Sequence, residues 1–135
     1  MDNFAQIQRV VVGFFVALDS FDTDRAVSLV TDDIEWLRES GTVRGRQQMR
    51  KALEGRAQDR RTRHLVANVE ADQSNPDSAR ARSDIVVYRG IAEADGPTLI
   101  AGPELLLSNV DDLVLSDGLW QIRKKAPTTV FKFTS

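Results

Sequence analysis

The chain has 135 residues, of which 41% are hydrophobic, and this suits one compact domain with a buried core. It has no cysteine, which excludes disulfides and thiolate catalysis, and its single histidine argues against a dedicated zinc site. The formal net charge of -2 provides no basic field for a nucleic acid or an anionic membrane. We therefore expect a single domain over residues 1–135 without nucleic-acid or membrane partners, and the lack of cysteine fits a cytoplasmic location.

Apolar residues spaced by three or four predict a first helix over about residues 3–18, with Asp2 or Asn3 as its N-cap. Within it, the apolar run 10–18 follows Arg9 and is also similar to the core of a signal peptide. The helical spacing begins before this run, and no small-residue cleavage pattern follows it. The run is too short to cross a bilayer, so we interpret it as part of a buried helix.

The next segments predict two further helices separated by a short strand. Asp22 or Thr23 can cap a second helix, which carries apolar residues between positions 26 and 30. Residues 34–37 are a strand candidate, and two glycines bracket a loop over 41–45. A third helix is expected over about 46–56, with a thin apolar stripe and most of its surface in water.

From Thr62 onward the pattern changes to a period of two, which is typical of strands. Strands are expected at about 63–72, 79–91, 98–115 and 119–132. Asp117-Gly118 marks a hairpin turn, because glycine adopts the positive φ that such a turn needs. Gly102-Pro103 marks a bulge or bend that would curl the sheet. The prediction is an α+β fold with three N-terminal helices packed in a strongly curved antiparallel sheet that forms a cone.

Two predicted strand segments are apolar on both faces, Ile85-Val86-Val87 and Leu105-Leu106-Leu107. One layer of helices covers only one face of a sheet, so the second face needs another partner. Two-fold homodimers are the commonest oligomers, and we expect a homodimer.

His64 is the only histidine, and it lies where a polar helical stretch gives way to a strand. The alternation of that strand places His64, Val66 and Asn68 on one face. An imidazole with an unperturbed pKa of about 6.5 transfers protons near neutral pH. His64 is therefore a candidate general base, and the alternative is a histidine that bonds a backbone carbonyl within the sheet.

Five segments, in the right order along the chain, resemble the nuclear transport factor 2-like superfamily and in particular its SnoaL-like branch. They are residues 17–22, 32–36, 45–46, 62–68 and 117–122. The resemblance implies an α+β cone, also described as a cystatin-like α+β barrel. The superfamily includes dehydratases, isomerases, polyketide cyclases, small subunits of ring-hydroxylating dioxygenases and members without known catalysis, so it implies no single reaction.

In scytalone-dehydratase-like members, an aspartate at the end of the first helix and a histidine on the strand after the third helix face the cavity. The matching positions here are Asp19 and His64. Those members carry a second cavity histidine, which this chain lacks. The helix C-terminus and the apolar neighbours Leu18 and Phe21 predict a raised pKa for the Asp19 carboxyl. The alternative for Asp19 is a solvated turn residue.

Four further residues are candidates for substrate binding: Trp36, Asn68, Asp84 and Tyr88. Trp36 and Tyr88, like Trp120, offer apolar area with a polar handle, and the alternative for each is ordinary core packing. Asn68 can bond a substrate oxygen or satisfy a neighbouring strand. Asp84 and Tyr88 share one face of the next strand, and the sequence does not fix which face turns inward.

Eight of the 18 Lys and Arg residues lie between Arg44 and Arg63. No aromatic residues interleave with these charges, so we interpret them as a solvated helix face rather than a nucleic-acid patch. Arg44, Arg46 or Arg63 can still receive an anionic substrate at the mouth of the cone.

The sequence thus predicts a cofactor-free, metal-free acid–base enzyme, a lyase or isomerase that acts on a small hydrophobic cyclic or carbonyl ligand. His64 would be the base, Asp19 its partner, and Asn68 or Tyr88 would orient an oxygen of the substrate. The alternative is a non-catalytic ligand-binding domain, or a partner subunit that resembles the small subunit of ring-hydroxylating dioxygenases.

Overall fold

A computed structural model describes residues 2–134, and its elements follow the predicted order of helices first and long strands last. The helices are α1 (Asn3–Asp19), α2 (Thr23–Ser28) and α3 (Gly45–Glu54). The strands are β1 (Val30–Trp36), β2 (Val43–Arg44), β3 (Arg60–Asn75), β4 (Ser78–Ile91), β5 (Leu105–Ser116) and β6 (Leu119–Lys132). The α+β fold class is confirmed.

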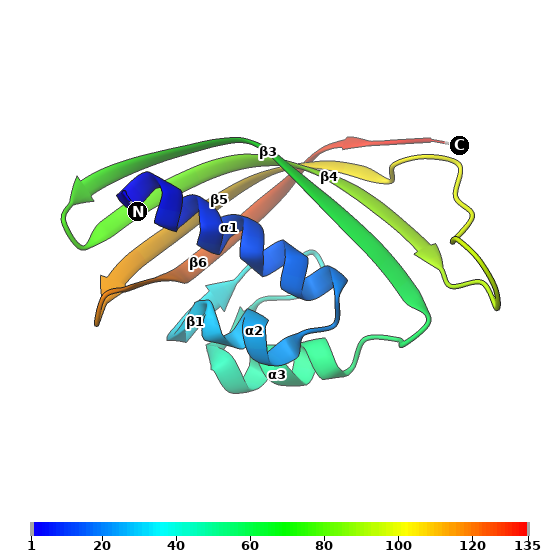
Figure 1. The fold of residues 1–135 in the computed structure, drawn as a ribbon, viewed down its shortest axis with the longest axis horizontal. Helices are drawn as coiled ribbons and strands as arrows, with labels where there is room; N and C mark the ends of the chain where they lie inside the picture. Colours follow the sequence, from blue (N-terminus) through cyan, green and yellow to red (C-terminus); the bar gives the residue numbers. More distant parts are fainter. Residues whose placement is uncertain (1, 135) are drawn as a thin grey trace.

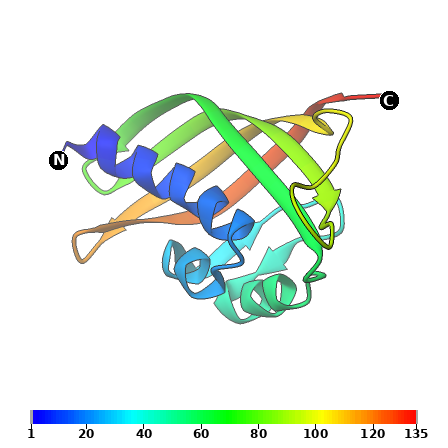
Figure 2. The same cartoon turned by 45° about the vertical axis from the view of Figure 1, so that its right-hand side comes forward.

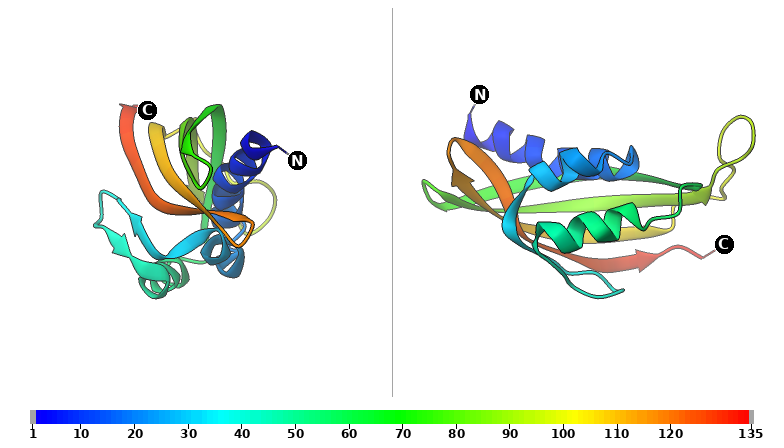
Figure 3. Two further views of the ribbon diagram at one scale, coloured as in Figure 1. Left: turned by 90° about the vertical axis from the view of Figure 1, so that its left-hand side faces the viewer. Right: turned by 90° about the horizontal axis from the view of Figure 1, so that it is seen from below.

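The strands form one curved six-stranded sheet in the order β2-β1-β6-β5-β4-β3 (Figure 3). Strands β3 to β6 pair antiparallel with their neighbours in sequence, whereas β1 pairs parallel with β6. The expected antiparallel sheet is therefore wrong at this edge, because no hairpin joins β1 to β6 and sets their relative direction. The sheet is not closed, since β2 and β3 lie at its two ends, so the expected barrel is wrong as well.

All three helices lie on one side of the sheet (Figures 1 and 2). Helix α1 runs along β3, α2 contacts α1 and α3, and α3 packs against β1. We call the face of the sheet that the helices cover the inner face and the opposite face the outer face. The hydrophobic core fills the space between the helices and the inner face, and it includes Phe14, Phe15, Ile85, Val87 and Ile122.

The predicted caps and hairpin turn are confirmed. Asp2 caps α1 by accepting the backbone N–H of Ala5 at 2.8 Å, and Asp22 caps α2 by accepting that of Arg25 at 3.1 Å. Asp117 and Gly118 join β5 to β6 with φ angles of 52° and 76°. Two consecutive positive φ angles fit a tight turn that matches the twist of the strands it connects.

The largest difference from the prediction is residues 98–104, which were expected to begin the third long strand. Strand β5 begins only at Leu105, after Pro103, which has no N–H to give to a ladder. The preceding loop folds back onto β4 at Gly90, where an added Cβ would lie only 2.6 Å from Thr98 Cγ2 and 2.7 Å from Ile100 Cγ2. The missing side chain of Gly90 allows this close approach.

Strand β3 begins earlier than expected, at Arg60, between the end of the expected third helix and the expected start of the strand at about residue 63. Its first residue pairs with Ile91 at the end of β4. Within residues 2–134, no helix is long and apolar enough to cross a membrane.

Candidate active site

Asp19 and His64 meet at the junction of α1 and β3, although they lie 45 residues apart in sequence. Asp19 is the last residue of α1, and His64 points from the inner face of β3. The Asp19 Oδ1 atom lies 2.6 Å from His64 Nδ1, and Asp19 Oδ2 accepts the backbone N–H of His64 at 2.7 Å. The hydroxyl of Thr62 also donates to Asp19 Oδ1 at 2.8 Å. Both side chains are largely buried, with 9% of Asp19 and 12% of His64 exposed.

These contacts set the chemistry of the pair. A carboxylate beside Nδ1 favours the tautomer with hydrogen on Nδ1, which leaves Nε2 free to accept a proton. Burial alone would raise the pKa of Asp19, but hydrogen bonds from the His64 side chain and backbone, together with the Thr62 hydroxyl, lower it below the ordinary 3.8. The predicted raised pKa is therefore wrong, because the prediction counted burial and the helix end but not these donors.

Phe15 and Arg56 complete the surroundings of the pair. The Phe15 ring stacks on the His64 imidazole with 5.0 Å between ring centroids. Arg56 Nη1 donates to the Leu18 carbonyl at 2.8 Å, and its Nη2 donates to Thr62 Oγ1 at 3.4 Å. Arg56 therefore satisfies a carbonyl at the end of α1, where a cation interacts well with the helix dipole.

Three predicted substrate-binding residues lie on the outer face, away from His64. On β4 the inner face carries buried Ile85 and Val87, so Asp84 and Tyr88 point outward. Asn68 lies in an irregularity of the β3–β4 pairing with a φ of 52°, and its Nδ2 donates to Asp84 Oδ2 at 2.8 Å. The assignment of Asn68 to the face of His64 is wrong, because the irregularity shifts the alternation of β3 after Ala67. For Asp84 and Tyr88 the sequence left the inward face of β4 open, and the structure turns their face outward.

Trp36 and Trp120 lie with the core. Trp36 packs edge-on against Phe14 with 5.4 Å between centroids, and the Arg38 guanidinium lies 5.1 Å from the Trp36 ring. Trp36 therefore contacts Phe14, and Phe14 in turn contacts Phe15, the ring that stacks on His64. Trp120 is 4% exposed and belongs to the hydrophobic core, which agrees with the alternative of ordinary core packing.

A buried polar cluster on β5 and β6 was missed from the sequence. Lys125 is 1% exposed, and its Nζ lies 2.9 Å from Asp111 Oδ1 and 4.4 Å from the Phe15 ring centroid. Asn109 Nδ2 donates to Asp111 Oδ2 at 2.9 Å. Phe15 thus contacts both His64 and Lys125. Burial lowers the pKa of Lys125, and the neighbouring Asp111 opposes this shift.

One signal for this cluster was present in the sequence. Every second residue of this part of β5 points to the same face, and these residues are Leu107, Asn109, Asp111 and Leu113. Lys125 was hidden, because the β5–β6 pairing shifts between Asp112 and Leu113 and changes the alternation of β6.

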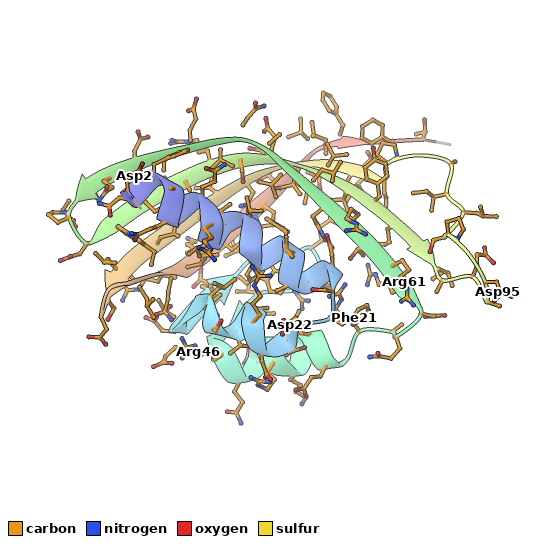
Figure 4. The ribbon with its side chains drawn as sticks, viewed as in Figure 1. Asp2, Phe21, Asp22, Arg46, Arg61 and Asp95 are labelled. Carbon is orange, nitrogen blue, oxygen red and sulfur yellow. The ribbon has the colours of Figure 1, made fainter. Side chains whose placement is uncertain are left out.

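Within residues 2–134, hollows along α1 include a small one and a large one, and neither of these is lined by His64. One, of about 10 Å³, lies beside Arg56 at the end of α1 and is also lined by Ala17, Leu18, Phe21, Thr23 and Leu53. Figure 4 labels Phe21 there, at the same end of the molecule as Arg61 near the start of β3. The other, of about 270 Å³, is an open hollow along α1 lined by Ala5, Gln8, Arg9 and Val12. The space beside the imidazole is occupied by Phe15.

The three arginines that were expected to receive an anionic substrate either form ion pairs within the protein or lie on the outer face. Arg44 forms an ion pair with Glu35 at 2.5 Å, and Arg46 bonds Asp32 and the Val30 carbonyl. Arg63 pairs in register with Tyr88 on the outer face. Among residues 2–134, no group of three or more Asp, Glu or His side chains is placed to hold a metal ion.

The family is decided by a match between residues 2–126 and the model of the SnoaL-like domain. The chain belongs to the SnoaL-like domain family. This confirms the resemblance to the nuclear transport factor 2-like superfamily over nearly the whole chain. No curated protein matches the sequence.

Solved structures with the same fold share little sequence with this SnoaL-like domain. A Mycobacterium tuberculosis protein of unknown function has 23% identity and a TM-score of 0.78, covering 93% of this chain and 70% of its own. Hexachlorocyclohexane dehydrochlorinase LinA-type3 from Novosphingobium barchaimii has 17% identity and a TM-score of 0.77, with coverages of 96% and 87%. ActVI-ORFA from Streptomyces coelicolor has 21% identity and a TM-score of 0.75, with coverages of 94% and 96%. At these identities the likeness shows the fold and does not transfer a reaction.

Proposed function

We propose that this SnoaL-like domain is a cofactor-free acid–base enzyme, a lyase or isomerase that moves a proton on a small cyclic or carbonyl compound. His64 Nε2 is the catalytic base, and Asp19 is the positioning residue that holds the ring. The observation that carries the proposal is the double contact of one carboxylate with the ring Nδ1 and the backbone N–H of the same histidine. A base whose orientation is fixed by a second group is the arrangement that general acid–base catalysis requires.

The step begins when Nε2 removes a proton from a carbon of the substrate. The electron pair of the broken C–H bond forms a carbon–carbon double bond. In an isomerisation the π pair of the adjacent carbonyl moves to its oxygen, and in an elimination a leaving group departs with its bonding pair. The imidazolium that forms is stabilised by the Asp19 carboxylate, which stays ionised because its pKa is lowered. The imidazolium then returns the proton to another atom of the substrate or gives it to the leaving group.

The apolar surroundings suit such a step. Phe15 stacks on the imidazole, Phe14 lies beside Phe15, and Trp36 packs on Phe14, so aromatic rings form a wall next to the base. We propose that the curved sheet and the helices form a cone around this wall, and that the substrate enters it by displacing the Phe15 ring. In support, one solved relative is named as a dehydrochlorinase, and dehydrochlorination removes a proton and a chloride.

The Kemp elimination of 5-nitrobenzisoxazole tests the proposal without knowledge of the natural substrate, because a base removes one C–H proton and a coloured phenolate forms. We expect the wild-type protein to accelerate it, and His64→Ala to lower the rate constant by about 10²- to 10⁴-fold. Tyr88→Phe, on the outer face, is the matched control and should keep the wild-type rate. Equal rates for wild type and His64→Ala would contradict the proposal and favour a non-catalytic domain.

We also infer that the domain forms a homodimer through its outer face. A row of apolar side chains crosses four strands there, with Leu65 opposite Val86, Val86 opposite Leu106, and Leu106 opposite Phe131. Leu65 is 50% exposed and Phe131 is 59% exposed. Burial of such a row in a second copy would remove it from water, and a two-fold axis allows the same patch to serve both copies.

A further inference from the structure

Three arginines gather at the end of the inner face where α1 ends and β3 begins. Arg60 and Thr62 lie four and two residues before His64 on β3, so their side chains point to the same inner face. Arg89 lies opposite Thr62 on β4 and follows the inward residues Ile85 and Val87. Arg56 reaches the same place from the segment after α3, because its Nη2 donates to Thr62 Oγ1 at 3.4 Å.

These guanidinium groups are close enough to repel one another. Burial, followed by repulsion from Arg60 and Arg89, lowers the pKa of Arg56. Burial, followed by repulsion from Arg89, lowers the pKa of Arg60. Like charges in a partly desolvated place are unfavourable unless an anion compensates them.

The protein itself supplies only part of that compensation. Arg89 Nη1 donates to Glu104 Oε1 at 3.0 Å, and Asp19 attracts Arg56. Arg60 has no side-chain hydrogen bond or ion pair within residues 2–134, and the buried Nε of Arg89 has no hydrogen-bond partner there. Three guanidinium charges against two carboxylates leave about one positive charge in excess, with free N–H donors around it.

The cluster lies next to the proposed base. Arg56 donates to Thr62 Oγ1, and the same hydroxyl donates to the Asp19 carboxylate that holds His64. Alternate residues on a strand are about 7 Å apart, so Thr62 and the facing Arg89 lie one such step from His64, and Arg60 lies two steps away. A small molecule anchored at the arginines therefore reaches His64 with the carbon skeleton that follows its anionic group.

We propose that Arg56, Arg60 and Arg89 bind a carboxylate of the substrate and place its carbon skeleton at His64. This inference rests on the proposed function and adds a substrate class to it, a small apolar compound with one carboxylate. A planar carboxylate accepts paired N–H groups from a guanidinium fork. A single negative charge also matches the single excess positive charge better than the double charge of a phosphate group does.

Binding of benzoate and of its neutral analogue benzamide, measured by NMR titration, tests the assignment. We expect the wild-type protein to bind benzoate at least about 10-fold more tightly than benzamide, since hydrogen bonds to a charged group are stronger than neutral ones. Arg60→Gln and Arg89→Gln should each weaken benzoate binding about 10-fold or more and leave benzamide binding unchanged. Glu104→Gln should strengthen benzoate binding, because it removes a competing carboxylate.

Three further variants make the test specific. Arg61→Gln removes an exposed neighbouring arginine that bonds only backbone carbonyls, and it should leave benzoate binding unchanged. His64→Ala should retain benzoate binding, which separates failure of the proposed catalysis from failure of the anion site. Arg60→Lys keeps the charge without the planar fork and should give an intermediate affinity.

Three outcomes would overturn the inference. The first is no measurable binding of benzoate, or equal binding of benzoate and benzamide, to the wild-type protein. The second is unchanged benzoate binding in both Arg60→Gln and Arg89→Gln, with folding verified by their NMR spectra. The third is tighter binding of inorganic phosphate than of benzoate at the same arginines. This result would mean that the site recognises a phosphate group and not a carboxylate of the substrate.

Discussion

Asp19 holds His64 at two points, with one carboxylate oxygen 2.6 Å from the ring Nδ1 and the other accepting the backbone N–H at 2.7 Å. The contact joins the last residue of α1 to an inward position of β3. Because one side chain fixes both the strand and the ring, the imidazole cannot turn without loss of a buried hydrogen bond. The proposed base is thus oriented by the fold itself.

The first prediction concerns this orientation. Asp19→Asn removes the negative charge that stabilises the imidazolium and the acceptor that selects its tautomer. We expect the Kemp elimination rate constant to fall by about 10²-fold or more, with a changed pH profile. Asp19→Glu restores the charge and should recover part of the rate. An unchanged rate and pH profile in Asp19→Asn would show that the carboxylate does not assist His64.

The second prediction concerns the pH dependence of stability. The pKa of Asp19 is lowered below 3.8, so its ionised form is favoured in the folded state. The resulting stabilisation is fully present above about pH 4 and is lost as the pH falls through the lowered pKa. Urea unfolding should therefore show a gap between wild type and Asp19→Asn that is largest near neutral pH and narrows in acid. A gap that widens in acid would contradict this sign.

The third prediction concerns the buried pair of Lys125 and Asp111. Asp111→Asn leaves a buried ammonium without its counter-charge, and we expect a loss of about 3–5 kcal/mol in the free energy of unfolding. The double variant Lys125→Met with Asp111→Leu replaces both charges by apolar groups and should recover most of this loss. Lys124→Met, at an exposed neighbouring position, is the control and should change stability by less than about 1 kcal/mol. A double variant less stable than Asp111→Asn would contradict the account.

The fourth prediction concerns the side chains that the structure places on the outer face. Asn68→Ala, Asp84→Asn and Tyr88→Phe should each keep the Kemp elimination rate within about twofold of wild type, since none of the three faces His64. The rates of the purified variants check this directly. A 10-fold loss in any of them would mean that the outer face takes part in the site.

The fifth prediction concerns assembly. Leu106→Glu places a charge in the middle of the apolar row on the outer face and should convert a two-chain species to a single chain in analytical ultracentrifugation. Leu119→Glu, at the 63% exposed start of β6, is the matched control and should leave the assembly unchanged. A wild-type protein that sediments as one chain, or only together with a larger oxygenase, would contradict homodimerisation.

The sequence predicted those features that depend on local chemistry. Asp2 and Asp22 cap helices because a short carboxylate reaches the free N–H groups of the first turn. Asp117 and Gly118 turn the last hairpin because both tolerate a positive φ. Asp19 and His64 were paired from the resemblance to a family, since helix and strand periods alone do not bring residues 45 positions apart together.

The features that were missed depend on register. A single irregularity after Ala67 removes Asn68 from the face of His64, and another between Ile122 and Lys124 of β6 brings Lys125 inside. An extra residue in a strand moves each following side chain to the opposite face of the sheet. Nothing in the local sequence marks where such an extra residue lies. The arginine cluster was missed because Arg60 lay outside the expected elements, between the third helix and the next strand, and Arg89 belongs to another strand.

The tautomer of His64, measured by nitrogen-15 NMR of the imidazole, shows directly whether Nε2 can act as the base. His64 is the only histidine, so its two ring nitrogens are assigned without ambiguity. For the neutral ring we predict hydrogen on Nδ1 and a free Nε2 in the wild-type protein, and loss of this preference in Asp19→Asn. A wild-type ring with hydrogen on Nε2 would contradict the account, because that nitrogen could not accept a proton from a substrate.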